Sequence, residues 1–386
     1  MKYTVAIILL LATLSDATAP PILVNQSNAV LDCRHAAIAG RDVGVRAEDV
    51  RNITIRNCRV GLCNVGIQLI NVSDSLIENT VVYSNNYRGL QLIDSPNNTL
   101  SNITGSGNAR YGGYAIELTG ASNGNSVERS RLEHNKGENG SNAYGIGIHD
   151  GPKFNTVAFS YIVNNQVGIR IERNASNNTV AHNYIAGNER GILLYSGANS
   201  TLMYNNTILG NHETGILIRR EVGHSVVQEN TIHRNYFGVR LVPKDTTGKP
   251  HQRPWWNRII GNDISYNVLD GIQFTGGTDP RNKCGGVRCD IQSNAIENNT
   301  IRYNLRGIYM WHASNNTISG NTICGNQQAA VFDADRLNNY YDNECNQSEF
   351  CSHECMTNVD IPLINGWNLI SIPIRNDIRR PFHEVL

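Results

Sequence analysis

Residues 195–220 read YSGANSTLMYNNTILGNHETGILIRR and end on Gly215 followed by three aliphatic residues before two arginines. The segment before it ends in the same way, on Gly191 followed by three aliphatic residues. Apolar residues alternate within such short segments, as expected for β-strands with one inward face. Asn and Gly stand between the segments, and both tolerate the left-handed backbone of tight corners. The stretch therefore predicts short strands joined by sharp corners.

The Gly-aliphatic start recurs from Gly44 to Ala330, in steps of 22 to 36 residues with a base period of about 23. Each repeat also carries an Asn-Asn-Thr-aliphatic segment and an Asn-x-Ile-x-x-Asn segment, so three short strands fall in each repeat. A fixed period of this length indicates a solenoid. Three strands per turn predict a parallel β-helix whose coils stack at about 4.8 Å, with ladders of aliphatic and Asn side chains. A leucine-rich repeat has a similar period, but it needs more Leu and a single strand per repeat.

Two N-terminal stretches and the later repeats carry a family resemblance. They are VLDCRHAAIAGRD at 30–42, VRNITIRNCRVGLCNVGIQLINVSDSLIENTVV at 50–82, and the later SNNTI…GN…GI units. They resemble β-helix proteins of the NosD-like, carbohydrate-binding and sugar-hydrolase (CASH) type, with a pectate-lyase-like fold, over roughly residues 28–346. The resemblance implies an all-β, single-stranded, right-handed parallel β-helix of about 12 coils. It implies no shared catalytic signature, because members resemble lyases, hydrolases, epimerases, copper-site maturation factors and surface proteins.

The two ends of the chain differ from the repeats. Residues 1–19 combine Lys2, a short apolar run and an Ala-x-Ala pattern, which is typical of a secretory signal peptide. We expect the β-helix over 20–346, and over 347–386 a Cys-containing linker and the start of a β module. INGWNLISIPI there reads as a turn and a strand, and the sequence stops before a module is complete. No other run approaches the roughly 20 apolar residues of a membrane span, so we expect a secreted or cell-surface protein.

Nine cysteines fit an exported, oxidised protein. The candidates for disulfides are Cys33, Cys58, Cys284, Cys289, Cys324, Cys345, Cys351 and Cys355. Cys33 and Cys58 stand about one repeat apart, which places them on neighbouring coils, whereas Cys284 and Cys289 bracket a small loop. The pairing of the others stays open, and Cys63 is left over. A zinc site is disfavoured, because no paired Cys-x-x-Cys is present.

Chemistry in a β-helix must come from outward columns, because the inward positions are filled. The fourth residue after each glycine points outward, and in four consecutive repeats it is His149, Glu172, Tyr195 and Arg219, with Asp150 adjoining. Imidazole, carboxylate, phenol and guanidinium groups suit polysaccharide lyases, epimerases and hydrolases, so we interpret these five residues as candidate catalytic residues. The alternative is ordinary cross-coil ion pairing, Glu172 with Arg219 and Asp150 with Arg173, contributing under ~1 kcal/mol per pair.

Inserted corners and exposed aromatic residues suggest a groove for a polymer. The segments 105–113 and 136–143 lengthen the corner before this strand, and 243–256 and 276–289 lengthen the corner after it. The candidate substrate-binding residues are Gln91, Glu117, Arg170, Arg173, Arg220, Trp255, Trp256, Tyr309 and Trp311. Flat aromatic rings offer surfaces on which sugars stack. The alternative is that the tryptophans pack under their own loop.

The first functional hypothesis is binding of an extracellular polysaccharide along the outer Gly-aliphatic face. The alternatives are a polysaccharide lyase, epimerase or glycoside hydrolase in the same groove, a structural surface-layer spacer, and a NosD-like copper-site maturation factor. The last has only four Met and no Cys, Met or His cluster. Basic and acidic residues balance at 33 each, which disfavours nucleic acid as a partner. No metal site is expected; calcium on loop carboxylates lacks a motif, so cofactors stay open, as do other cell-surface proteins as partners.

Overall fold

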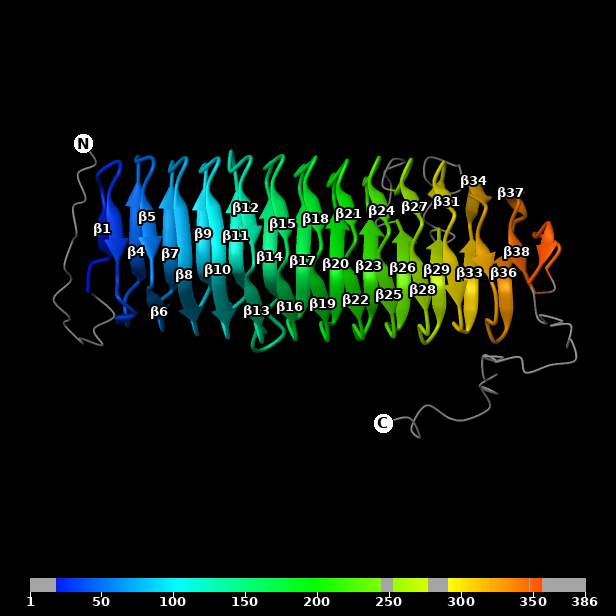
Figure 1. Ribbon diagram of the computed structural model, residues 1–386, viewed down its shortest axis with the longest axis horizontal. Helices are drawn as coiled ribbons and strands as arrows, with labels where there is room; N and C mark the ends of the chain where they lie inside the picture. The colour runs from blue at the N-terminus through cyan, green and yellow to red at the C-terminus, as the bar shows by residue number, and fades with distance from the viewer. Residues whose placement is uncertain (1–18, 244–252, 277–290, 347, 356–386) are drawn as a thin grey trace, which may run out of the picture. The chain divides into compact units, whose positions relative to one another are not determined.

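The computed structural model describes residues 19–243, 253–276, 291–346 and 348–355. Thirteen strands, most of them beginning at the Gly-aliphatic pair, stack in parallel as one sheet, here named the GI sheet (Figure 1). In stacking order they are β1 (Ile22–Val24), β4 (Val43–Glu48), β7 (Val65–Ile70), β9 (Arg88–Ile93), β11 (Gly113–Thr119), β14 (Ala143–His149), β17 (Val167–Glu172), β20 (Arg190–Tyr195), β23 (Thr214–Arg219), β26 (Phe237–Val242), β29 (Asp270–Thr275), β33 (Arg306–Trp311) and β36 (Ala329–Asp333).

The rest of each coil contributes to two further parallel stacks. The second stack holds β2 (Val30–Asp32), β5 (Thr54–Arg56), β12 (Ser126–Glu128), β15 (Thr156–Ala158), β18 (Thr179–Ala181), β21 (Leu202–Tyr204), β24 (Val226–Gln228), β27 (Arg258–Ile260), β30 (Ile291–Gln292), β31 (Ala295–Glu297), β34 (Ala313–Ser319) and β37 (Leu337–Tyr341). The third stack holds β3 (Ala37–Ala39), β6 (Arg59–Gly61), β13 (Arg131–Glu133), β16 (Tyr161–Val163), β19 (Tyr184–Ala186), β22 (Thr207–Leu209), β25 (Thr231–His233), β28 (Asp263–Ser265), β32 (Thr300–Arg302), β35 (Thr322–Ile323), β38 (Glu344–Cys345) and β39 (His353–Glu354). Two longer strands, β8 (Leu76–Tyr83) and β10 (Thr99–Ser106), run through both stacks.

The predicted fold class is confirmed as an all-β, right-handed parallel β-helix. The structure has about 13 coils, one more than expected, because β1 precedes the first Gly-aliphatic pair at Gly44. No helix forms in the described part of the chain, so none there is long and apolar enough to cross a membrane.

Inward aliphatic residues form the continuous ladders that the repeat predicts. Ile169, Ile192 and Ile216 pair in register on β17, β20 and β23, and each is fully buried. Burying a side chain of this size stabilises the fold by about 1.5–3 kcal/mol, and the ladder repeats that gain coil after coil.

The two asparagines of the Asn-Asn-Thr motif have different roles. Asn205 has a left-handed backbone with φ 49° and forms the corner. Asn206 is buried, and its Oδ1 accepts hydrogen bonds from the backbone N and the Nδ2 of Asn183, both at 3.0 Å. Its own Nδ2 donates to the Val180 carbonyl at 2.8 Å. The Asn ladder therefore satisfies backbone groups that the corners leave without strand partners.

The glycine of the Gly-aliphatic pair is required by close approach between coils. A Cβ built on Gly191 lies 2.5 Å from the carbonyl oxygen of Gly215, which is backbone and has no room to move. The corner role predicted for the glycines between the segments is confirmed at residues such as Gly187, whose φ is 62°.

Disulfides lie near both ends of the described solenoid. Cys33 and Cys58 are bonded across neighbouring coils, as their spacing predicts, and the remaining Cys63 is free and buried. At the other end Cys324 pairs with Cys355, and Cys345 with Cys351. Cys284 and Cys289 lie outside the described residues.

Strand pairing continues beyond residue 346, the expected end of the repeats, because β39 pairs with β38. The predicted signal peptide up to residue 18 and the segment from 356 onward lie outside the described residues.

Candidate functional site

The outer face of the GI sheet, here named the GI face, carries the predicted ladder. Strand pairing places His149 of β14, Glu172 of β17, Tyr195 of β20 and Arg219 of β23 in register on consecutive coils. The four strands that carry them lie in the green part of the ribbon, midway along the stack (Figure 1). Two of them lie deep although they point outward, since Glu172 is 1% and His149 is 8% exposed. The register is as predicted; their catalytic roles stay a prediction.

Glu117 of β11 is the centre of a buried network that the sequence reading assigned only to substrate binding. It is 1% exposed and accepts hydrogen bonds from Arg88 Nε and Gln91 Nε2, both at 2.6 Å. His149 Nε2 lies 2.9 Å from its Oε1. Burial raises the pKa of Glu117, but the hydrogen bonds from His149 and Arg88 outweigh burial, so this pKa lies below its ordinary value.

His149 lies between two carboxylates. Its Nε2 faces Glu117, and its Nδ1 lies 2.6 Å from Asp150 Oδ2. Burial lowers the pKa of His149, but Glu117 and Asp150 outweigh burial and raise it above its usual value. An imidazole that donates both N–H groups has no lone pair free for a substrate proton. When both of its nitrogens are protonated, His149 donates to Glu117 and Asp150 at once and holds the two carboxylates in place.

The ion-pair partners of Asp150 and Glu172 are arginines near the end of β17. Asp150 pairs with Arg173, with Nη1 and Oδ2 3.2 Å apart, as the ion-pair alternative expects. Glu172 pairs with Arg170 of its own strand and, at 3.7 Å, with Arg173. The Glu172–Arg219 pair of that alternative does not form, although Glu172 Oε1 is buried and accepts no hydrogen bond among the described residues.

Two buried tyrosines complete this end of the site, and the sequence reading missed both. The Tyr114 ring stacks on Tyr144 at 4.9 Å and on His149 at 5.1 Å. It fills the space over Gly147, where a Cβ would strike the ring. The Tyr144 hydroxyl accepts a hydrogen bond from Arg170. The sequence held a signal for this arrangement. Gly147 stands in a column whose other members are mostly large, and Tyr114 and Tyr144 occupy equivalent positions near the start of neighbouring strands.

The middle of the GI face is apolar and then basic. Leu193 and Leu217 lie side by side in register and are 7% and 4% exposed. Beyond them, Arg219 follows Tyr195 in its column, and the Arg220 guanidinium lies 5.7 Å from the centre of the Tyr195 ring.

The C-terminal part of the face is aromatic. Tyr309 of β33 stacks on Phe332 at 5.1 Å, with the Arg306 guanidinium 3.9 Å from its ring centre. Trp311 of the same strand is 43% exposed. This part of the face therefore presents the aromatic surface that the sequence predicted from Tyr309 and Trp311.

The other two predicted tryptophans lie at a corner of a coil. Trp255 forms backbone bridges with Gly223 and Gln292, and its indole packs over Gly223. Trp256 beside it is 60% exposed. The structure does not place either of them in the columns of the GI face, in which Trp311 lies.

One wall of the expected groove falls within the described residues. The loops at 105–113 and 136–143 contact each other through an Arg110–Glu138 ion pair with Nε and Oε2 2.9 Å apart. The insertions at 243–256 and 276–289 lie mostly outside the described residues.

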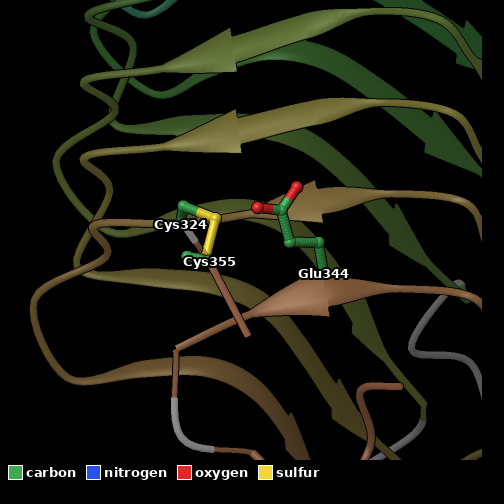
Figure 2. Close-up of side chains that lie close together, drawn as sticks. All are labelled: Cys324, Glu344 and Cys355. Atoms are coloured by element: carbon green, nitrogen blue, oxygen red, sulfur yellow. A yellow bond between two sulfur atoms is a disulfide. The ribbon is translucent and has the colours of Figure 1, made fainter. Parts of the chain in front are cut away.

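One group of metal-type side chains lies close together in the described part of the chain. Cys324, Glu344 and Cys355 offer ligand atoms within 4.8 Å of one another (Figure 2). Both sulfurs are joined in a disulfide, so neither is a thiolate that could bind a metal. Two methionines, Met203 and Met310, are fully buried in the core. This donor set does not fit copper, which prefers thiolate, thioether and imidazole ligands.

Comparison with known families gives two matches. A family described as "Periplasmic copper-binding protein (NosD)" matches residues 118–273 and 273–355. A second, "Right handed beta helix region", matches residues 13–151. The sequence matches no curated protein.

Several solved structures share the fold at low identity. A mannuronic acid specific polysaccharide family 6 lyase from human gut microbiota is 11% identical, covers 84% of this chain and 86% of its own, and has a TM-score of 0.60. The A-module of Azotobacter vinelandii mannuronan C-5 epimerase AlgE6 is 16% identical, with coverage of 85% and 89% and a TM-score of 0.57. The AlgE4 A-module is 14% identical, with coverage of 83% and 90% and a TM-score of 0.57. These likenesses establish the fold.

Proposed function

The chain belongs to the NosD family, and from this premise we propose that it is an exported β-helix protein that binds an extracellular polysaccharide along the GI face. The observation that carries the proposal is the face itself. Polar, charged and aromatic side chains stand in register from β9 to β33, one coil apart. A periodic row of this kind suits a ligand that is itself a linear repeat.

The export and the polymer class have separate support. The disulfides fit an oxidising compartment, and the family description is periplasmic. The lyase and the two epimerases with the same fold are named for mannuronic acid or mannuronan, which supports a polysaccharide as the ligand class here.

Binding accounts for the candidate site better than catalysis does. Glu117 and His149 are buried and held by several partners each, which describes a rigid platform. A general base needs a free lone pair within reach of the substrate. Catalysis by the predicted residues His149, Asp150, Glu172, Tyr195 and Arg219 is the second candidate. It is favoured by the Asp150 carboxylate, whose side chain is 46% exposed beside this network.

The described residues do not support a copper-binding role. The family description names copper, but the described cysteines are bonded or buried and the described methionines lie in the core. No step of the proposed function uses a metal.

A glycan panel tests the proposal. The purified protein is passed over immobilised polyuronates and neutral polysaccharides, and retention is scored together with unsaturated or epimerised products. We expect retention without product. Trp311→Ala should weaken retention by about tenfold, since a stacked ring contributes about 1 kcal/mol beyond its buried area. Tyr341→Ala is the matched control, an exposed ring on β37 away from the GI face, and should change nothing. Retention of no glycan, or equal loss in both variants, would refute the proposal.

A further inference from the structure

Arginines on the GI face are paired with carboxylates along most of its length. The pairs are Arg46–Glu48, Arg88–Glu117, Arg170–Glu172, Arg190–Glu213 and Arg306–Asp270. Arg173, at the corner after β17, pairs with Asp150 in the same way. Because pairing is the rule on this face, an arginine without a carboxylate stands out.

Three neighbouring arginines break the rule. Arg219 ends β23 and Arg220 follows it, and Arg240 lies on the next strand, β26, in register with Leu217. None of the three has a carboxylate within ion-pair distance among the described residues. The Nε of each is buried and has no hydrogen-bond partner there. An unpaired buried N–H is unfavourable, and three like charges at adjacent positions repel one another.

The acidic residues around this cluster are already occupied. Glu213 binds Arg190 with Nη2 and Oε2 2.5 Å apart, and Asp270 binds Arg306 and accepts a hydrogen bond from Gln273. Glu221 follows Arg220 in the chain but forms no ion pair among the described residues. In the described part of the chain no carboxylate therefore forms an ion pair with Arg219, Arg220 or Arg240, and Glu213 and Asp270 act on Arg240 only from beyond ion-pair distance.

The surface around the cluster suits a sugar as well as an anion. Leu193 and Leu217 form an apolar floor beside Arg240, and the Tyr195 ring lies under Arg220. A guanidinium group binds carboxylate or sulfate oxygens through paired N–H donors, and an apolar floor accommodates the C–H face of a sugar ring.

We propose that Arg219, Arg220 and Arg240 form a subsite for the anionic groups, carboxylates or sulfate esters, of an acidic polysaccharide that lies along the GI face. The inference rests on the proposed function and adds that the ligand is a polyanion. The subsite lies three to four coils from His149, roughly 14–19 Å at the spacing of parallel strands. One polymer chain is long enough to contact both.

A double variant tests the subsite. Affinities are measured by affinity electrophoresis for a polyuronate, a sulfated neutral backbone and the same backbone without sulfate. Arg219→Gln with Arg240→Gln should weaken binding of an acidic polymer by tenfold to about a hundredfold, because each charge-assisted hydrogen bond contributes about tenfold. The control, Arg129→Gln with Arg131→Gln, removes the same charge at two exposed positions, one after β12 and one at the start of β13, and should stay within about twofold of wild type. The two acidic arms show which anion is bound.

The outcomes separate this inference from the proposed function. If the double variant binds the acidic polymers like wild type, or if wild type prefers the neutral polymer, the subsite is refuted while polysaccharide binding stands. If wild type retains no polymer, both proposals fall.

Unfolding gives a further check that needs no ligand. Arg240→Gln should leave the unfolding midpoint unchanged or higher, whereas Arg190→Gln, which breaks the pair with Glu213, should lower it. Equal losses in the two variants would show that Arg240 has a structural partner and would refute the subsite.

Discussion

Replacing Glu117 by Gln is the sharpest test of how the candidate site is held. The carboxylate of Glu117 is 1% exposed and accepts from three donors, on Arg88, Gln91 and His149. Gln offers one acceptor oxygen and an NH₂ group, so at least one donor then faces another donor. The charges of Arg88 and His149 also lose a partner.

The size of the effect follows from burial. Neutralising one partner of a buried ion pair costs about 3–5 kcal/mol of unfolding free energy. The Arg88 side chain is 32% exposed, so water compensates part of the loss. We therefore expect the lower end, about 3 kcal/mol. The pKa of His149 should fall, because Glu117 is one of the two carboxylates that raise it.

Urea unfolding near pH 6, followed by far-UV circular dichroism, measures the loss of unfolding free energy. Variant and wild type are compared with the same dependence of that free energy on urea concentration. Glu128→Gln is the matched control, the same chemical change at an exposed pair with Arg129, and should cost under ~1 kcal/mol. If Glu117→Gln is as mild as Glu128→Gln, and the pKa of His149 measured by NMR does not move, then Glu117 does not anchor the site. The description of His149 as a bridge between Glu117 and Asp150 would then be wrong.

Three further predictions concern stability. Asn206→Ala should lower the unfolding free energy by about 2–5 kcal/mol in urea unfolding, because the Asn183 N–H and the Val180 carbonyl lose their partner, whereas Asn205→Gly at the exposed corner should cost little. Gly191→Ala should shift the coils or prevent folding, seen as loss of the cooperative thermal transition, since its Cβ meets a backbone oxygen at 2.5 Å. The Tm difference between wild type and His149→Asn should be largest between about pH 4.5 and 6.5. Because the pKa of Glu117 is lowered in the folded protein, its stabilisation is lost as the pH falls through that pKa. Because the pKa of His149 is raised, its stabilisation is lost as the pH rises through that pKa. A Tm difference that stays the same at alkaline pH would contradict this.

The repeat alone determined most of the architecture. The period of about 23 residues indicated which residues point inward and which outward residues share a column, as with His149, Glu172, Tyr195 and Arg219. This works because parallel coils stack at one spacing and in one register, so equal positions in successive repeats become neighbours. The bond between Cys33 and Cys58 followed from the same rule.

Only the tertiary structure decided which outward side chains bind one another. His149 contacts Glu117 from a different column, Glu172 binds Arg170 rather than Arg219, and Tyr114 occupies the space over Gly147. Arg219 consequently keeps no carboxylate among the described residues. Long side chains reach diagonally across strands, and each partner is selected by rotamer, burial and competition among several donors for one carboxylate. These choices depend on distances in three dimensions, which the spacing of residues along the chain does not encode.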